Sequence, residues 1–155
     1  MDALDRKILG ALMVDGRVTW SELASRFGVS SPAISDRIRR LEKRGVIQGY
    51  RVLVDPVQLG YDITAFVAVT LEHPRHRQRL LNYVQATTAI QECHHVAGEG
   101  DYLLKLRCSR MADLEEILSE EIKGLPGISQ TKTAIVLSTV KETTELRVEN
   151  DGDLE

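Results

Sequence analysis

The stretch that decides the fold of this chain is TWSELASRFGVSSPAISDRIRRLEKRG, residues 19–45. It opens with a hydroxyl at Thr19 and a carboxylate three residues later at Glu22, which is the spacing of a capping box at the start of a helix. Gly28 is typical of the end of a helix, and the Ser-Pro pair at 31–32 is typical of the start of the next one. Two helices joined by a short turn that contains glycine form a helix-turn-helix, which this stretch therefore predicts.

Apolar residues on both sides of the turn recur at helical spacing. In the helix after the turn, Ile34, Ile38 and Leu41 fall on one face, which we expect in a core. Another helix precedes this pair and ends at the Asp-Gly pair 15–16. Its apolar face consists of Leu4, Ile8, Leu9 and Leu12. The sequence therefore predicts a three-helix domain over residues 1–45.

The opposite face of the third helix has the composition of a DNA-reading surface. A helix of this kind places its N-terminal half in the major groove, where an arginine can bind both acceptors of guanine. We expect Arg39 and Arg40 to read bases in this way. Asp36 precedes Arg40 by four residues and is expected to orient its guanidinium by an ion pair, or else to accept from the N4 amino group of cytosine. This face comprises Pro32, Ala33, Asp36, Arg39, Arg40 and Lys43.

A second group of polar residues is better placed for the phosphate backbone than for bases. Hydroxyl groups and free N–H groups at a helix start bind phosphate, and flanking cations add to this attraction. The residues expected to do so are Ser30, Ser31, Arg37, Lys43, Arg44 and Arg51. An arginine-rich helix face can also be merely solvated, but the capping box, the glycine turn and the Ser-Pro start together favour double-stranded DNA as the partner.

The charge of the chain is divided unevenly. Residues 1–60 hold ten Lys and Arg against seven Asp and Glu, whereas residues 61–155 hold ten against sixteen. Between Arg26 and Arg51 there are seven basic residues and two acidic ones, although the whole chain has a net charge of −3. A nucleic-acid footprint depends on such local charge rather than on the total.

Composition restricts the class of protein. The chain has 155 residues, of which 43% are hydrophobic and 28% charged, as expected of a folded globular protein. No apolar run approaches the roughly 18 residues that span a bilayer, and the acidic MDALDR start does not resemble a signal peptide. Two cysteines give no disulfide framework. We therefore expect a cytoplasmic protein with no membrane partner.

The second half of the chain predicts a different fold, a ferredoxin-like βαββαβ domain, so that the whole chain is α+β. Strands are expected at 63–71, 90–97, 102–108 and 128–140, and helices at 74–87 and 111–122. The predicted organisation is a helix-turn-helix domain at 1–45, a linker at 46–61 with a strand in GYRVLVD (49–55), the ferredoxin-like domain at 62–145 and an acidic tail at 146–155.

The first strand of the second domain is apolar on both faces. One face carries Ile63, Ala65 and Val67, while the other still carries Phe66 and Ala68. Because the helices cover only one face of such a sheet, and large apolar patches are uncommon on monomers, the second face predicts a partner subunit.

Three motifs resemble the Lrp/AsnC (feast/famine) family of transcriptional regulators: LDRKIL (4–9), DGRVTWSELASRFGVSSPAISDRIRRLEKRGVIQGY (15–50) and GEGDYLLKL (98–106). The resemblance extends from about residue 4 to residue 146. It implies dimers that form through the C-terminal sheets and assemble further, commonly to octamers. It also implies a small effector, usually an amino acid, bound between C-terminal domains.

The resemblance places the effector at a set of positions in the second domain. These positions are His94, Gly98, Gly100, Asp101, Tyr102, Met111, Ala134, Ile135 and Val136. The residues themselves are compatible with this role, because glycines expose backbone N–H groups to a carboxylate and Asp101 can accept from an α-ammonium. An ordinary hairpin turn with Gly98 and Gly100 at positive φ is the alternative.

Two other functions compete with that of a sequence-specific regulator. An architectural protein that wraps DNA needs the same basic helix but little sequence preference. The sirohaem decarboxylases resemble this family in fold and are enzymes, with His94 or His95 as candidate haem-contacting residues; the basic third helix argues against this enzyme, and we expect no cofactor and no catalytic residue. Cys93, His94 and His95 do not predict a metal site, because alternate strand residues point to opposite faces.

Overall fold

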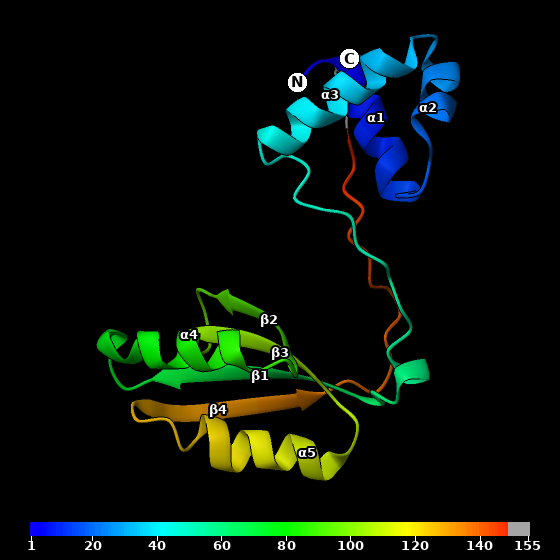
Figure 1. Ribbon diagram of the computed structural model, residues 1–155. Helices are drawn as coiled ribbons and strands as arrows, with labels where there is room; N and C mark the ends of the chain where they lie inside the picture. The colour runs from blue at the N-terminus through cyan, green and yellow to red at the C-terminus, as the bar shows by residue number, and fades with distance from the viewer. Residues whose placement is uncertain (149–155) are drawn as a thin grey trace. The chain divides into compact units, whose positions relative to one another are not determined.

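The structure, a computed structural model, describes residues 1–148, so most of the predicted acidic tail at 146–155 lies outside the described residues. It consists of two compact units (Figure 1). Residues 1–53 form the first unit together with the segment that begins at Lys141, and Val54–Val140 forms the second. Among the described residues, no helix is both long and apolar enough to cross a bilayer.

Three helices build the first unit: α1 (Ala3–Val14), α2 (Trp20–Phe27) and α3 (Ser31–Lys43). The predicted capping box of α2 is present, since the Thr19 side chain accepts from the N–H of Glu22 while the Glu22 carboxylate accepts from the N–H of Thr19. Gly28 ends this helix at φ 67°, a left-handed conformation that favours glycine. The core contains Ile8, Ala11, Leu23, Ala24, Ile34 and Ile38.

The second unit is a four-stranded antiparallel sheet with the strand order β2-β3-β1-β4. Its strands are β1 (Ile63–Leu71), β2 (Ile90–His95), β3 (Tyr102–Cys108) and β4 (Ile128–Ile135). Two short 3₁₀ turns, Val57–Leu59 and Pro74–His76, precede β1 and α4. This order of elements confirms the ferredoxin-like prediction.

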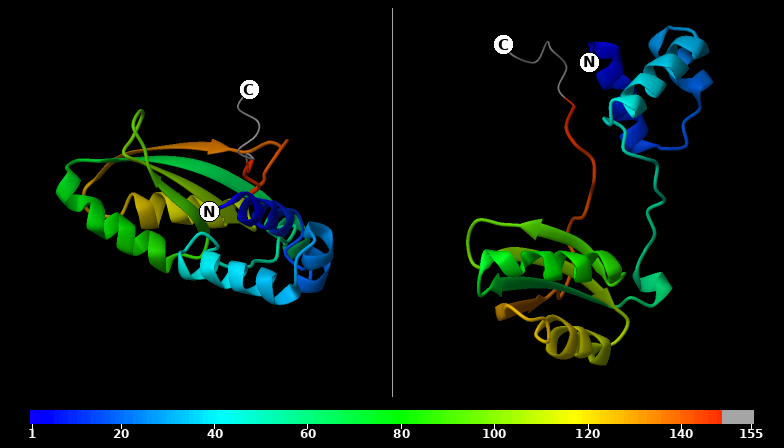
Figure 2. Two further views of the ribbon diagram at one scale, coloured as in Figure 1. Left: turned by 90° about the horizontal axis from the view of Figure 1, so that it is seen from above. Right: turned by 60° about the vertical axis from the view of Figure 1, so that its left-hand side comes forward.

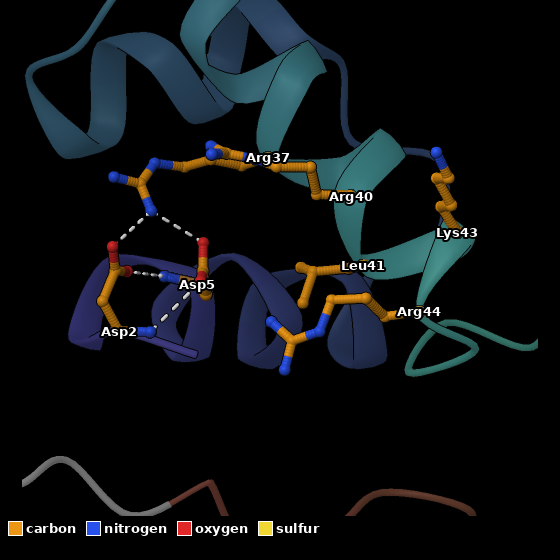
Figure 3. Close-up of a pocket in the computed structure, with 7 residues that line it drawn as sticks. All are labelled: Asp2, Asp5, Arg37, Arg40, Leu41, Lys43 and Arg44. Carbon is orange, nitrogen blue, oxygen red and sulfur yellow. Dashed lines mark hydrogen bonds and ion pairs between the residues drawn. The ribbon is translucent and has the colours of Figure 1, made fainter.

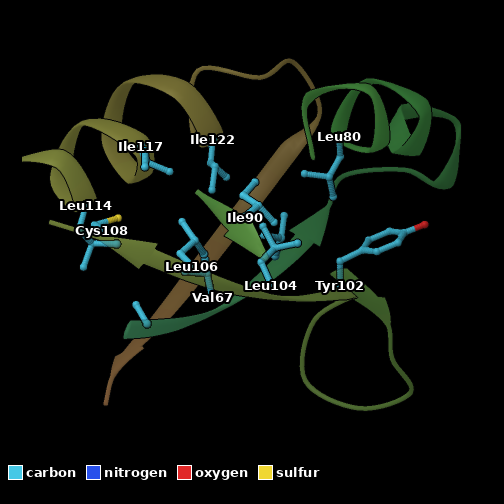
Figure 4. Packing of buried hydrophobic residues seen from close by; sticks show 12 residues of the cluster. Val67, Leu80, Ile90, Tyr102, Leu104, Leu106, Cys108, Leu114, Ile117 and Ile122 are labelled. Carbon is cyan, nitrogen blue, oxygen red and sulfur yellow. The ribbon is translucent and has the colours of Figure 1, made fainter. Parts of the chain in front are cut away.

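Two helical segments cover one face of this sheet (Figures 2 and 4). They are α4 (Arg77–Ala86) and α5 (Met111–Glu116), and the latter continues as a π-helix over Ile117–Ile122. Alternate residues of β1 and β3 point towards these helices and make the core. Its fully buried members include Val67, Leu80, Leu104, Leu106, Leu114 and Ile122.

The predicted strand at 49–55 is wrong, since this stretch has no strand conformation. Val52 and Leu53 are 86% and 83% exposed. Their β-branched and apolar character favours an extended backbone, but a strand forms only where a second strand supplies hydrogen-bond partners, and no strand of the described chain pairs with this stretch. The last strand also ends at Ile135 rather than at residue 140, because β1, on which it pairs, begins at Ile63.

Candidate nucleic-acid interface and effector positions

The apolar face of α3 fixes which of its side chains reach solvent. Ile34, Ile38 and Leu41 are at most 1% exposed, which confirms the predicted orientation. Ser30 caps the helix, with its hydroxyl accepting from the N–H of Ala33 at 3.4 Å. Rotation of α3 is therefore set by the core of the first unit, and its polar face must point outward.

The side chains of α3 that were predicted to meet DNA lie on this outward face, with one exception described below. Arg39, Arg40 and Lys43 are exposed and, within residues 1–148, make no ion pair. Their charges are therefore available to a ligand. Ser30, Pro32, Asp36 and Arg44 are also exposed, while Ser31 and Ala33 are half-buried.

The predicted ion pair between Asp36 and Arg40 is wrong, because neither residue makes an ion pair within the described chain. Both side chains are exposed. A surface pair of this kind on a helix contributes only about 0.3–0.5 kcal/mol, which does not hold two solvated side chains together.

Arg37 is the exception on α3. Its guanidinium lies 2.5 Å from Asp2 Oδ2 and 2.7 Å from Asp5 Oδ1, two carboxylates at the start of α1 (Figure 3). Its side chain is only 24% exposed, and the Asp5 side chain 15%. Arg37 was predicted as a phosphate contact, but in this structure it links α3 to α1.

Asp2 and Asp5 are residues that the sequence analysis missed, although a signal was present. They form a capping box, in which each side chain accepts from the other residue's backbone N–H, and Asp-x-x-Asp spacing before an apolar run is its mark. Hydrogen bonds from the N–H of Asp5 and from Arg37 lower the pKa of Asp2, and the two carboxylates raise the pKa of Arg37. Both shifts favour the charged, paired state.

A shallow pocket of about 230 Å³ lies beside this ion pair, between α1 and α3 (Figure 3). The charges of Asp2 and Asp5 are paired with Arg37. The unpaired positive charges around the pocket are therefore those of Arg40, Lys43 and Arg44. The pocket is lined by Asp2, Asp5, Arg37, Arg40, Leu41, Lys43 and Arg44.

In the second unit, Asp101 organises the loop between β2 and β3. Its N–H donates to the carbonyl of Val69 at 2.8 Å, and its Oδ2 accepts from the N–H of Leu71 at 2.7 Å. One carboxylate oxygen is thus engaged by the end of β1.

Gly100, next to Asp101, lies close to the backbone of β1. Its φ is +86°, and a Cβ at this position would lie 3.2 Å from the carbonyl oxygen of Val69. The positive φ favours glycine, and a side chain here would also require β1 to shift by a few tenths of an ångström. Gly98, also at positive φ, has open space around it.

Tyr102 and His94 face opposite sides of the sheet. Tyr102 is 6% exposed in the core beneath the helices, and its ring stacks on His95 with centroids 5.0 Å apart. His94 lies on the open face, where its Nε2 is 3.2 Å from Glu92. Lys105, buried on the same face, donates to Glu92 at 3.1 Å, and both contacts lower the pKa of Glu92, that from His94 most.

The predicted effector positions fall into two groups at opposite ends of the sheet. The loop at 98–101 precedes Tyr102 at the start of β3, whereas Met111 follows the end of that strand. Ile135 pairs with Ala65, near the same far end. Six residues of extended strand separate the ends by roughly 20 Å. Met111 therefore lies far from the loop within one chain, whereas Ala134, which pairs with Phe66, is three residues along the strands from the row of Tyr102. The second group contains Met111, Ala134, Ile135 and Val136.

The described residues contain no group of three His, Cys, Asp or Glu side chains that could hold a metal ion. In β2, Cys93 pairs with Leu104 on the core side, whereas His94 pairs with Leu103 on the open face. The alternation that separates these side chains is that of any strand.

Comparison with known proteins agrees with this arrangement of two domains. The model of the AsnC-type helix-turn-helix domain matches residues 1–42, and that of the Lrp/AsnC ligand binding domain matches residues 64–146. The chain belongs to the Lrp/AsnC family. This Lrp/AsnC protein is accordingly a DNA-binding transcriptional regulator with a ligand-binding domain.

Three relatives illustrate the match. The leucine-responsive regulatory protein of Escherichia coli K12 is 40% identical over 148 residues, which cover 94% of this chain and 90% of that protein. The structure of E. coli AsnC has a TM-score of 0.88 and 32% identity, covering 94% of this chain and 97% of that one. A transcriptional regulator from Neisseria meningitidis, solved with L-Met, has a TM-score of 0.90 and 27% identity, covering 95% and 96%.

Proposed function

We propose that this Lrp/AsnC protein is a cytoplasmic regulator that reads specific double-stranded DNA sites with α3. The observation that carries this proposal is the exposed, unpaired cationic face of a helix whose other face is locked in the core. Arg39 and Arg40 are assigned to bases, with Asp36 and Ala33 beside them at the groove. The residues assigned to phosphates are Ser30, Ser31, Lys43 and Arg44.

Arg37 has a different role in this proposal. Two carboxylates already hold its guanidinium, so it positions α3 against α1 rather than contacting phosphate. Both aspartates contact its Nη1, and a phosphate that approached the remaining N–H groups would be repelled by these two neighbouring carboxylates. Arg44 and Lys43 make no such ion pair within residues 1–148, which favours them as backbone contacts.

We further propose that a small amino acid modulates DNA binding from a cleft between two copies. The L-Met complex of the Neisseria relative supports the ligand class. The separation of Met111 from the loop supports a shared cleft, because the loop of one copy can meet Met111 only in another copy. Backbone N–H groups at 98–100 would hold the carboxylate, and the free oxygen of Asp101 would hold the ammonium group.

The open face of the sheet is the proposed dimer surface. Phe66 is 37% exposed there, with Ala68 and Leu103 half-buried beside it. This apolar centre resembles the composition of a subunit interface more than that of a free surface. Beside it, the buried Lys105 pairs with the exposed Glu92. Two reading helices related by a two-fold axis would then favour near-palindromic sites.

Genome-wide DNA-binding measurements with and without each of the twenty amino acids test the function as a whole. A regulator of the proposed kind occupies a limited set of related sites, and one amino acid changes that occupancy. Occupancy without a shared sequence would instead support the architectural alternative. The regulators among its relatives favour DNA binding over the decarboxylase alternative.

A further inference from the structure

The loop between β2 and β3 lies against the open face of the sheet beside β4. A Cβ at Gly100 would lie 3.5 Å from the Cβ of Ala68 on β1, and the N–H of Asp101 donates to the carbonyl of Val69 on the same strand. Ala68 in turn pairs with Lys132 on β4. Directly paired residues of neighbouring strands share a face of the sheet, so the Lys132 side chain lies on the open face, one strand away from the loop.

An ion pair joins this lysine to the tip of the loop. Lys132 Nζ donates to Glu99 Oε1 at 2.5 Å, and this contact lowers the pKa of Glu99, which keeps the carboxylate ionised. The Lys132 and Glu99 side chains are 53% and 81% exposed. Ion pairs as exposed as this one are weak, so another carboxylate can readily replace Glu99 on the lysine.

The position of this ion pair relates it to the proposed effector. Glu99 lies between the two glycines whose backbone N–H groups were assigned to the effector's carboxylate, and Asp101, assigned to its ammonium group, follows two residues later. The ammonium group of Lys132 thus lies beside the proposed carboxylate site. In the ligand-free chain it is bound by Glu99, whose side chain ends in the same chemical group as an amino acid's carboxylate.

We propose that Lys132 binds the carboxylate of the effector, and that Glu99 occupies Lys132 until the effector replaces it. The inference rests on the proposed function, to which it adds a side-chain cation and a competitor within the chain. Replacement of Glu99 breaks the ion pair between the loop and β4. Effector binding therefore frees the loop from β4 on the face proposed to form the dimer.

Two substitutions should change effector affinity in opposite directions. E99Q should raise it about two- to fivefold, because the effector no longer has to displace a competing carboxylate. K132Q should lower it about tenfold, because a hydrogen bond between charged groups is lost. The double variant E99Q/K132Q should bind like K132Q, since the competitor has no effect once the cation is absent. If the ion pair only held the loop in its binding conformation, E99Q would instead lower the affinity.

Calorimetry on the full chain measures these changes. The twenty amino acids are titrated into the wild type, and the one that binds most tightly is used on all variants together with its α-carboxamide. The carboxamide lacks the negative charge, so the wild type should bind it more weakly than the acid. K132Q should reduce this difference between the two compounds. A lysine that only supported the fold would affect both compounds equally.

Two control variants remove the same charges elsewhere in the second unit. E120Q and K123Q lie at exposed positions in and directly after the π-helix and should bind both compounds like the wild type. The proposal is overturned if E99Q lowers the affinity, or if E99Q and K132Q titrate like these controls while the wild type binds an amino acid. A wild type that binds none of the twenty would overturn the proposed effector function, and this inference with it.

Discussion

The guanidinium of Arg37 on α3 lies 2.7 Å from the carboxylate of Asp5 on α1, and Asp2 completes the contact from the same helix end. This ion pair connects the N-terminal helix to the middle of the reading helix. It also removes one arginine from the surface that the other basic residues of α3 present to solvent. The arginines of α3 therefore differ in their surroundings. Arg37 contacts α1, whereas Arg39 and Arg40 face solvent.

The first prediction concerns this contact. D2N/D5N should lower the melting temperature of the full chain at neutral pH, because Arg37 loses two charged partners. The pKa of Asp2 is held below its ordinary 3.8, so its contribution is present above that value and is lost as pH falls through the lower folded-state pKa. The melting temperatures of wild type and variant, followed by circular dichroism, should therefore converge in acid.

The matched control is D15N, which makes the same kind of change at the end of α1. The Asp15 side chain accepts from the N–H of Arg17, and an asparagine oxygen keeps that hydrogen bond. D15N should melt close to the wild type. A D2N/D5N protein as stable as D15N at neutral pH would show that the Arg37 contact does not hold α3.

The second prediction concerns base reading. R40A should weaken binding to a specific site by about 1–3 kcal/mol and relax the preference at one base position, because a bidentate contact to guanine is lost. Fluorescence anisotropy with a set of single-base site variants measures both effects. Unchanged affinity and unchanged preference would contradict the assignment of Arg40.

The third prediction concerns the phosphate backbone. K43A should weaken binding to all DNA sequences alike, because a phosphate contact carries no sequence information. It should also reduce the slope of log affinity against log salt concentration by about one unit. A slope identical to that of the wild type, measured on the same DNA, would remove Lys43 from the interface.

The fourth prediction concerns the effector and uses the two hydrogen-bonding roles of Asp101. D101N keeps an oxygen that can accept from the N–H of Leu71 but loses the charge that holds an ammonium group. It should therefore abolish the amino-acid response while leaving effector-free DNA binding intact, as calorimetry with the twenty amino acids and anisotropy can show. D101A should lose the loop contact as well.

Binding of an amino acid to D101N with wild-type affinity would mean that the ammonium group is held elsewhere. A wild type that binds none of the twenty would mean that this regulator works without an amino-acid effector. A coupling free energy of about 1–3 kcal/mol between effector and DNA suffices for a 5–150-fold change in apparent affinity.

The fifth prediction concerns the dimer of the open face. F66E places a charge at an apolar position that is 37% exposed in the single chain and should be buried in the dimer. Sedimentation of the full chain should show a loss of dimer. The control Q85E, which also introduces a glutamate but at an exposed position on α4, should have no effect. Equal sedimentation of both variants would contradict the assignment of this face.

Local patterns in the sequence determined most of the elements and the outward face of α3. The Thr19–Glu22 capping box, Gly28 and the spacing of Ile34, Ile38 and Leu41 act within one or two helical turns, so they can be recognised without knowledge of the fold. The prediction of a strand at 49–55 failed because strand formation does not depend on local sequence alone. Its residues favour an extended backbone, but a strand depends on a partner strand that is often distant in sequence, and none of the strands within residues 1–148 pairs with this stretch.

Contacts between distant residues were decided only by the tertiary structure. Asp2 and Arg37 are 35 residues apart, and nothing local predicts that packing of α1 on α3 brings them together. Packing likewise placed Asp101 on the end of β1, 30 residues away, and set Met111 at the other end of the sheet. Sequence periodicity determines which face a side chain occupies, whereas its neighbours follow from how the helices and strands pack, which is a property of the whole core.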